Sequence, residues 1–426
     1  MIRHGEAARA QQNMKAFNEL THFSGLDWAK DHHDVVIMDQ RGQVVEELTF
    51  AHSAEGWQQW RERVQRYGAL GVAIETSSGP VVEQLLDSGV IVYPMNPKSA
   101  QRYRDRHVPS GNKTDRVDAW SFADALRVDG HGWRPLSELD PVIQELRLLC
   151  RDEVGLIEQR TALVNQLQEA LQAYYPTALA CFDDWTAPYT WAFVEKFPTP
   201  EVLAKAGTGR WHNFLHQHKL YRPQTVKKRL EQFAKAEEFT GSAAVTRAKS
   251  RLAVSLAKTL VTLEKQLREY RAAIAKLFAD HPDHHLFGSL PGAGEKLAPR
   301  LLSEIGQDRN LFNNPQSLQC VAGTAPVSFQ TGQIKKARIR WHCNRHLRAA
   351  IHLWADCSRP CCAWAQAYYK AHRDKGSTHA AALRCLGQRW LKILWKMWQE
   401  QKPYDAERHA LDQQKHGSWI LQLQPK

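Results

Sequence analysis

The sequence predicts a mixed α/β domain followed by a long all-α region, and three observations carry this prediction. Up to about position 97, short β-branched and apolar runs typical of strands alternate with two stretches of helical period. From about position 138, apolar residues recur at spacings of three and four over roughly ten helical turns. The chain has 426 residues, 43% of them hydrophobic, which is enough apolar surface for two or three separate cores.

The N-terminal part predicts the order strand, strand, strand, helix, strand, helix, strand. The strand-like runs are THFSGLDWAK, DVVIMD, QVVEELTF, GVAIET and VIVYPMN, with a hairpin turn at QRG. Residues 53–67 and the run VVEQLLDSG have a helical period. An antiparallel hairpin joined to a short parallel sheet in this order is the arrangement of a ribonuclease-H-like fold, although the order alone is ambiguous among α/β folds.

The second half predicts a helical arm and then a second helical domain. Two long amphipathic stretches, about 138–174 and 225–278, flank a Trp- and Pro-containing segment at 182–223. They predict an antiparallel helical hairpin or a coiled coil, whose expected roles are spacing and oligomerisation. The expected division of the chain is a flexible arm at 1–20, an α/β domain at 21–137, a helical arm at 138–284, a helical C-terminal domain at 285–402 and a tail at 403–426.

A Pro-Gly-Ala-Gly run between two short helical stretches predicts a helix-hairpin-helix-like element near position 290. Gly292 and Gly294 would let backbone N–H groups at a helix start approach a phosphate. The alternative is a plain glycine-containing turn between two helices. Later in the chain, helix packing is the expected role of Trp364, Trp390, Trp395 and Trp398.

Charge and composition favour nucleic acid as the partner. The balance of 57 Lys+Arg against 45 Asp+Glu gives a net charge of +12, which favours a polyanion. The eight cysteines lack the spacing of a disulfide scaffold and no leader opens the chain, so we expect reduced thiols in a cytoplasm. No stretch approaches the roughly 18 consecutive apolar residues of a membrane span, which favours nucleic acid over lipid.

Four carboxylates predict a metal centre. Asp27 and Glu75 end two predicted strands that are neighbours in a ribonuclease-H-like sheet, and Asp115 and Asp118 share one face at the start of a helix. Converging carboxylates repel unless cations lie between them, and hard oxygen ligands select Mg²⁺ or Mn²⁺. Two such ions are the standard arrangement for attack on a phosphodiester. Taken singly, each residue could instead end a strand, pair with a lysine or cap a helix.

Several other polar residues receive a less specific interpretation. Asp124 is expected on the surface, as are Asp31, His32 and His33 in a turn. Cys357, Cys361 and Cys362 with His352 lack the spacing of a zinc finger, so they are expected to be buried, unligated thiols.

Six motifs carry a resemblance to a known family. SGLDWAKDHHDVVIMD, VAIETSSGP, NPKSAQRYR, NKTDRVDA, LPGAGEKLAPRLLSEIG and CVAGTAPVSFQTGQ resemble the DEDD transposases of the insertion-sequence one-ten group, the bridge-RNA-guided recombinases. The resemblance covers about residues 20–400. It implies a RuvC-like domain at 21–137 that holds magnesium on the four carboxylates, a coiled coil, and a C-terminal transposase domain with a nucleophilic serine.

The nucleophile is where this chain departs from the family pattern. The family serine precedes a glycine shortly after an Ala-Pro pair, and here that position is Gln330-Thr331-Gly332. Thr331 carries the same hydroxyl, although its extra methyl group stiffens χ1. We therefore expect Thr331 to attack the DNA phosphate, with Ser328 as the reserve nucleophile.

Basic residues flank both expected catalytic elements. One group surrounds the second pair of carboxylates and the other follows Thr331, so both are expected to contact phosphates, with Tyr103 and Trp341 stacking on unpaired bases. The first group is Lys98, Arg102, Arg104, Arg106, Lys113 and Arg116, and the second is Lys335, Lys336, Arg338, Arg340, Arg345 and Arg348.

Three functional hypotheses follow from these residues. The leading one, implied by the resemblance, is an RNA-guided transposase that cuts and rejoins donor and target duplex DNA, acting as a homotetramer built as a dimer of dimers. The second is a metal-only, structure-selective nuclease of the Holliday-junction type, which would not need Thr331. The third is a nucleic-acid-binding protein whose acidic residues only cap helices and pair locally.

Overall fold

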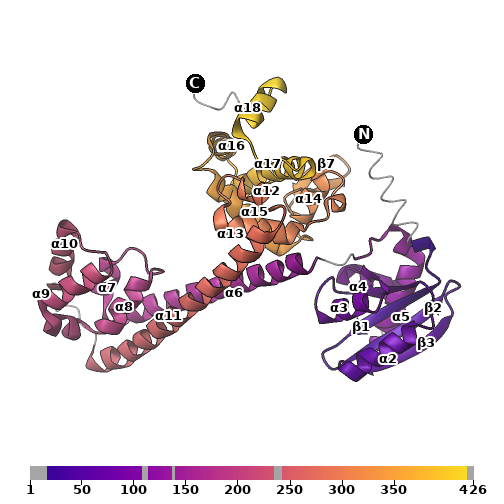
Figure 1. Cartoon of the computed structure of the whole chain (residues 1–426), viewed down its shortest axis with the longest axis horizontal. Coiled ribbons are helices and arrows are strands. Elements are labelled where there is room, and N and C mark those ends of the chain that lie inside the picture. Colours follow the sequence, from indigo (N-terminus) through magenta and orange to yellow (C-terminus); the bar gives the residue numbers. More distant parts are fainter. Residues whose placement is uncertain (1–16, 108–113, 137–139, 235–241, 420–426) are drawn as a thin grey trace. The chain divides into compact units, whose positions relative to one another are not determined.

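The chain forms two compact units, Met1–Leu139 and Asp140–Lys426. The computed structural model describes residues 17–107, 114–136, 140–234 and 242–419 (Figure 1). Most of the predicted arm at 1–20 and the end of the predicted tail at 403–426 lie outside these residues. The first unit is mixed α/β and the described part of the second unit is mainly helical, as the sequence predicts. The second unit also contains one two-stranded sheet, which was not predicted.

A five-stranded sheet forms the centre of the first unit. Its strands are β1 (His22–Trp28), β2 (His32–Asp39), β3 (Val44–Ala51), β4 (Leu70–Ile74) and β5 (Ile91–Pro94). They lie side by side in the order β3-β2-β1-β4-β5. β1 is antiparallel to β2 and parallel to β4, β2 is antiparallel to β3, and β4 is parallel to β5. The predicted succession of strands and helices is confirmed.

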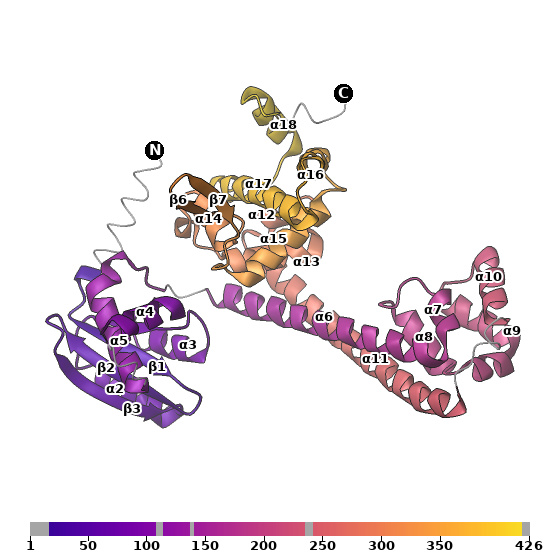
Figure 2. The ribbon, with the colours of Figure 1, turned by 180° about the vertical axis from the view of Figure 1, so that it is seen from behind.

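Helices cover both faces of this sheet. They are α2 (Ala54–Val64), α3 (Pro80–Asp87), α4 (Pro97–His107) and α5 (Asp115–Asp129), followed by the 3-10 turn η1 (Gly130–Gly132). Because successive side chains of a strand point to opposite faces, Leu26 packs with α2 and α3 while its neighbours in β1 face α5. Figure 2 shows α5 running across the strands.

Gly25 allows α5 to lie directly on β1. A Cβ atom added to Gly25 would lie 2.0 Å from the Ala119 carbonyl oxygen and 2.6 Å from the Ala123 nitrogen. No real Cβ tolerates such distances to backbone atoms, so any other residue would push the helix away from the strand. This contact sets the position of the first turn of α5 relative to the end of β1.

We expect Gly25→Ala to destabilise the first unit by about 3 kcal/mol, at the upper end of the usual cost of overpacking, because the new methyl group meets rigid backbone. Chemical denaturation followed by circular dichroism measures the change. Gly132→Ala is the control, since its Cβ would meet nothing within 4 Å. Equal midpoints for the Gly25→Ala protein and the wild type would contradict the proposed close contact.

Two long helices form the arm of the second unit. α6 (Pro141–Tyr174) and α11 (Ala243–Asp280) lie side by side and run in opposite directions (Figures 1 and 2). Ion pairs join them at Arg160–Glu264 and Arg271–Glu153, both at 3.0 Å. The earlier residue of α6, Glu153, pairs with the later residue of α11, Arg271, and this order is that of antiparallel helices.

The predicted helix at 225–278 is wrong in extent. A separate helix, α10 (Pro223–Ala234), precedes α11, which starts at the Ser242 N-cap. The Ser242 hydroxyl accepts a hydrogen bond from the Val245 N–H, which fixes a helix start inside the predicted run.

The segment between the long helices has its own core, and we call residues 175–234 the aromatic lobe. Its helices are α7 (Pro176–Cys181), α8 (Pro188–Lys196), α9 (Pro200–Gln217) and α10. Buried rings fill the interior, among them Trp191, Trp211, Phe193 and Phe214. The Trp- and Pro-containing segment is therefore a folded body and not a simple connection.

The remaining chain forms a helical bundle. Its elements are α12 (His284–Gly288), α13 (Gly294–Ile305), η3 (Arg309–Leu311), α14 (Pro315–Val321), β6 (Val327–Thr331), β7 (Ile334–Arg338), α15 (Arg345–Ser358), α16 (Ala363–Asp374), α17 (His379–Glu400) and α18 (Ala406–Lys415). Trp364, Trp390 and Trp398 are buried in its core and Trp395 packs against it, which confirms their predicted role. Within the described residues, no helix has the length and apolar run that a membrane span needs.

Candidate metal centre and nucleic-acid interface

Asp27 and Glu75 come together at one edge of the sheet. β1 and β4 pair in parallel, with Gly25 opposite Ala73 and Leu26 opposite Ile74, and the next residues along the chain are Asp27 and Glu75. Gly25 and Ala73 face α5, so the period of two puts Asp27 on that face and directs Glu75 there as β4 ends. Asp27 is partly buried and Glu75 is exposed.

Asp115 and Asp118 arrive on the first turn of α5. The Thr114 hydroxyl caps this helix by accepting a hydrogen bond from the Val117 N–H. The contact at Gly25 places the start of the helix over the end of β1. Asp118 is buried and Asp115 exposed, so the two carboxylates of the pair lie at different depths.

The carboxylates around Asp27 act on it electrostatically. Burial, followed in order by the negative charges of Asp118, Asp115, Glu75 and Asp34, raises the pKa of Asp27 to about 7. The four predicted carboxylates and a fifth, Asp34, thus share one electrostatic neighbourhood. Among the described residues, His32, Asp34 and Asp115 are the only group of three or more that brings ligand atoms within 4.8 Å of one another.

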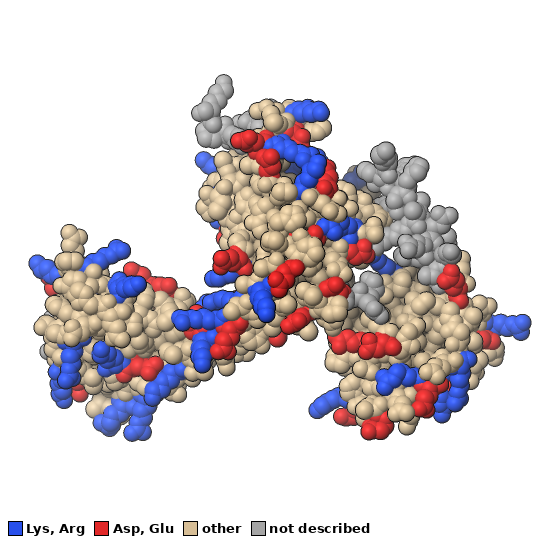
Figure 3. Space-filling view, in the orientation of Figure 1, with Lys and Arg blue, Asp and Glu red and all other residues tan. Residues whose placement is uncertain are grey.

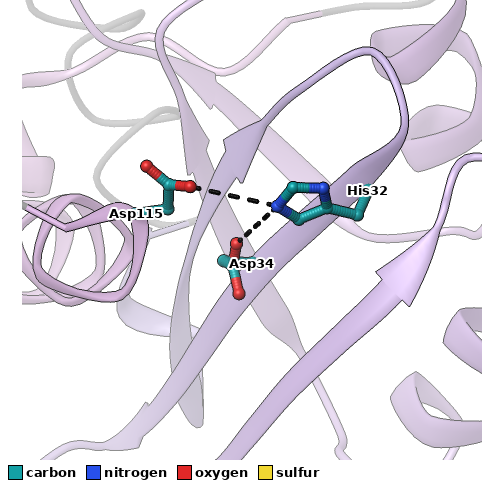
Figure 4. A group of neighbouring side chains, drawn as sticks. All are labelled: His32, Asp34 and Asp115. Carbon is teal, nitrogen blue, oxygen red and sulfur yellow. Dashed lines mark ion pairs between the residues drawn. The ribbon is translucent and has the colours of Figure 1, made fainter.

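The fifth carboxylate, Asp34, and the neighbouring His32 were not predicted as site residues. Asp34 lies directly opposite Asp27 in the β1–β2 ladder. His32 Nε2 is 3.5 Å from Asp34 Oδ2 and 3.9 Å from Asp115 Oδ2 (Figure 4). One ligand atom from each of these three residues lies within 4.8 Å of the others, so the group could hold a metal ion.

The short turn between the first two predicted strands was the sequence signal that could have placed Asp34 at the site. A tight turn joins β1 to β2, with the Ala29 N–H donating to the His32 carbonyl oxygen at 3.0 Å. Centring the hairpin on this turn sets Asp27 against Asp34.

The expectation of a surface turn is wrong for His33, which is buried against Phe50 and Trp57 on the opposite face of the sheet.

Arg104 neutralises part of the carboxylate cluster. Its guanidinium lies 2.5 Å from Asp118 Oδ1 and is largely buried. The charge of Glu75 also acts on it, and both interactions raise the pKa of Arg104. Arg104 was predicted to contact phosphate; in this structure it is bonded to a proposed metal ligand.

The rest of the first basic group is more exposed. Lys98, Arg102 and Arg106 are exposed on α4, while Arg116 pairs with Glu47 at 2.6 Å. Lys113 lies outside the described residues. Three side chains of this group thus remain open to a polyanion.

Asp124 and Tyr103 correct two predictions. Asp124, expected on the surface, is buried and accepts hydrogen bonds from Arg127 and from the Tyr103 hydroxyl, the latter at 2.8 Å. Tyr103 is likewise buried, so it does not offer a face on which a base could stack. The six-residue spacing from Asp118 turned Asp124 away from the metal centre and into the helix packing between α4 and α5.

Thr331 lies at the tip of an exposed hairpin. It ends β6 opposite Ile334 of β7, and Gly332 takes the positive φ of 54° that the two-residue turn requires. Every residue of both strands is exposed, including Lys335, Lys336 and Arg338. The Arg338 guanidinium lies 4.1 Å from the centre of the Phe329 ring.

The last members of the second basic group divide into structural and exposed residues. Arg340 donates to the Ala325 carbonyl oxygen at 3.3 Å, and Arg348 donates to the carbonyl oxygen of Arg340. These two guanidinium groups hold the base of the hairpin. Arg345 is exposed, and Trp341 presents an open face because its side chain is 75% exposed.

Gly292 and Gly294 serve different purposes. Both have positive φ, 74° and 53°. A Cβ on Gly292 would lie 2.5 Å from the Cys357 carbonyl oxygen, so this glycine allows close packing on α15. Gly294 starts α13 with open space around it, which leaves it the better placed of the two for a phosphate.

The cysteines are free thiols but are less buried than expected. Among the described residues, none forms a disulfide. Cys357 and Cys361 are exposed and Cys362 is partly exposed, because they lie at the end of α15 and in the following turn. The predicted burial is wrong for Cys357 and Cys361, whereas Cys362 is half-buried against the core of the bundle.

Comparison with known proteins gives two family matches. A transposase model of the DEDD type named for IS110 matches residues 24–176, and a model described as the transposase IS116/IS110/IS902 family matches residues 284–370. The protein of the IS117 mini-circle from Streptomyces coelicolor, whose name assigns it as a transposase, is 31% identical over 92% of this chain and 97% of its own.

Two further relatives come from insertion elements. A 44.8 kDa protein of IS116 from Streptomyces clavuligerus is 25% identical over 89% of this chain and 94% of its own. A 42 kDa protein of IS900 from Mycobacterium paratuberculosis is 28% identical over 68% of this chain and 73% of its own. The chain combines an α/β domain that carries acidic residues with a helical region, and the matches identify this combination as a transposase, an enzyme that acts on DNA. The chain belongs to the IS110/IS116/IS902 family of DEDD transposases.

The raised pKa of Asp27 makes the metal-free protein sensitive to pH. The folded state keeps this proton up to about pH 7, whereas an unfolded chain releases it near 3.8. Between these values the folded state binds more protons, so stability falls as pH rises through the window and levels off above about 7.

We therefore expect Asp27→Asn to gain stability over the wild type between about pH 4 and 7 and to keep a constant advantage above that range. Thermal melts in EDTA at several pH values measure the difference. Asp129→Asn, an exposed change on α5, is the control. A difference between Asp27→Asn and wild type that does not change with pH would contradict the crowding of carboxylates around Asp27.

Proposed function

We propose that the chain is an RNA-guided DNA recombinase that cuts and rejoins strands to move an insertion sequence. The observation that carries the proposal is the convergence of Glu75, Asp115 and Asp118 on Asp27 at the edge of the sheet. The strand order supports a RuvC-like, ribonuclease-H-like identity for this domain, and the family matches support action on DNA.

The chemistry of these residues fits Mg²⁺. Carboxylate oxygens are the hard ligands that this ion prefers, and the Arg104 guanidinium pairs with one of the four carboxylates, that of Asp118. We infer two ions on Asp27, Glu75, Asp115 and Asp118, with Mn²⁺ as a substitute that the nearby His32 imidazole would also suit. Bound Mg²⁺ would polarise the phosphodiester and stabilise the leaving oxygen.

The residues of the chain divide this work. Asp27 must lose its proton before it can bind a cation, and the cation in turn lowers its pKa. Arg104 orients Asp118 and limits the repulsion among the carboxylates. Asp34 and His32 lie beside Asp115 at the β1–β2 turn.

Thr331 is the proposed nucleophile. Its hydroxyl oxygen would attack phosphorus, the bond from phosphorus to one deoxyribose oxygen would break, and the hydroxyl proton would pass through solvent to that leaving oxygen. The product is a threonine phosphoester on one DNA end and a free hydroxyl on the other, so rejoining needs no ATP. The exposed hairpin tip and the neighbouring Lys335 and Lys336 support this role.

Partners follow from the same proposal. A structured bridge RNA would pair with donor and target duplex DNA, so that base pairing and not a protein motif selects the sequence. Exposed basic residues on α4 and on the hairpin would contact phosphates. The exchange of four strands favours a homotetramer, a dimer of dimers.

The metal requirement is tested with Asp118→Asn in the full chain with its RNA and DNA. We expect Mg²⁺-dependent cleavage to fall by about a hundredfold or more, because a direct metal ligand is lost while the side chain keeps its shape. Asp129→Asn is the matched control on the same helix. Unchanged cleavage, or a rate independent of Mg²⁺, would refute the catalytic role and favour a protein that only binds nucleic acid.

Thr331→Ala separates the recombinase from a metal-only nuclease of the Holliday-junction type. We expect the variant to lose both strand exchange and the covalent protein–DNA adduct that mass spectrometry would locate on Thr331, since no hydroxyl remains to attack. Ser328→Ala, on the same strand, should keep both. An adduct on Ser328, or cutting that persists without Thr331, would overturn this assignment.

A further inference from the structure

The aromatic lobe carries positive charge that the proposed chemistry does not use. Residues 175–234, with the first turns of α11 at 242–251, hold eleven Lys and Arg against five Asp and Glu. Within the described chain, none of these basic side chains takes part in an ion pair. Figure 3 shows Lys and Arg spread over this end of the second unit. Uncompensated charge of this kind indicates a polyanionic partner.

Some of these cations have structural roles and others do not. Arg229 donates to the Cys181 carbonyl oxygen at 3.0 Å, and the Lys196 ammonium lies 5.6 Å from the centre of the Phe214 ring. Such contacts hold side chains against the lobe. The exposed basic residues without a contact of this kind include Lys205, Arg210, Lys227 and Lys228.

A helix start inside α9 adds backbone donors to this surface. The chain leaves helical geometry at Gly207, with φ 70° and ψ 169°, so α9 is two helices joined by a sharp turn. Residues 207–210 are exposed, and a Cβ on Gly207 or Gly209 would meet nothing within 4 Å. The first N–H groups of a helix have no acceptor within it, and bare glycines leave them open to a phosphate.

Both glycines of this turn are as open as Gly294 and more open than Gly292. A Cβ on Gly292 would meet Cys357, whereas a Cβ on Gly207, Gly209 or Gly294 would meet nothing within 4 Å. Lys205 and Arg210 stand immediately before and after it in the chain. The helix start therefore combines open amides with two cations.

We propose that the aromatic lobe binds a nucleic-acid backbone, with Lys205, the Gly207–Arg210 helix start, Lys227 and Lys228 contacting phosphates. The buried aromatic core makes the lobe a fixed platform for these groups. The proposal rests on charge and exposure in the second unit, so it stands whether or not the carboxylate site cleaves DNA. It gives the arm a binding role beyond the spacing and oligomerisation that the sequence predicts.

Salt-dependent binding of the full chain tests the charge. We expect the quadruple variant Lys205→Gln, Arg210→Gln, Lys227→Gln, Lys228→Gln to flatten the slope of log affinity against log salt by about three, since each phosphate contact contributes roughly 0.9 on duplex DNA and roughly 0.7 on single strands. Four exposed lysines of the last three helices and the segment between α17 and α18 form the control of equal charge. They are Lys370→Gln, Lys392→Gln, Lys402→Gln and Lys415→Gln.

A labelled DNA duplex and a labelled RNA hairpin are the two probes. A flatter salt slope with one probe supports the proposal and identifies the nucleic acid that the lobe binds. A flatter salt slope with both probes supports recognition of the shared phosphodiester backbone. An unchanged slope with both probes, or an equal change in the control, would overturn the proposal.

Substitutions at Gly209 test the role of the helix start without altering the core of the lobe. Gly209→Glu places a negative charge beside the open amides, and Gly209→Ala adds only a methyl group into open space. We expect the glutamate variant to bind at least one of the probes about tenfold more weakly than the alanine variant, with equal melting temperatures. Equal affinities for both probes would remove the helix start from the proposed surface.

Discussion

The contact between α5 and β1 at Gly25 is the constraint on which the candidate metal centre depends. Acidic residues on a helix and on a strand can share a cation only if the two elements bring their carboxylates within reach of one ion. The missing side chain of Gly25 permits that approach, and the Ala119 and Ala123 backbone fills the space. Asp115 and Asp118 then stand over the end of the strand that carries Asp27.

Bringing these groups together has an electrostatic cost that the fold does not relieve by itself. Arg104 balances one carboxylate, and Asp27 responds to the remaining charge with a pKa raised to about 7. A divalent cation would offset this repulsion and change the protonation of the site at the same time. Metal binding and proton release are therefore linked in this account.

The sequence predicted what depends on local pattern. Strand periodicity and helix caps placed Asp27, Glu75, Asp115 and Asp118 at element ends, and the fold brings those ends together. Register decides the rest, because Asp34 and His32 join the group only through the exact pairing of β1 with β2, which alternating hydrophobicity does not specify. Asp124 shows the same limit of local pattern, since the sequence around it does not indicate that it will be buried and hydrogen-bonded to a tyrosine hydroxyl.

Helix ends were a second source of error. A Ser before an apolar run is a known start signal, yet continuous apolar spacing across 225–278 hid the Ser242 cap. The aromatic lobe was not predicted for a related reason. Spacing along the chain does not show that the short helices between its prolines enclose the aromatic side chains. Tertiary packing, which spacing along the chain does not encode, turned this segment into a body with a basic surface.

Anomalous diffraction from crystals grown with Mn²⁺ tests the central claim most directly. The account predicts peaks within about 2.2 Å of oxygens from Asp27 and from at least two of Glu75, Asp115 and Asp118, as expected for ligands of a hard cation. Absence of any peak at these carboxylates in Mn²⁺-saturated crystals, or ions bound only at unrelated acidic residues, would contradict it.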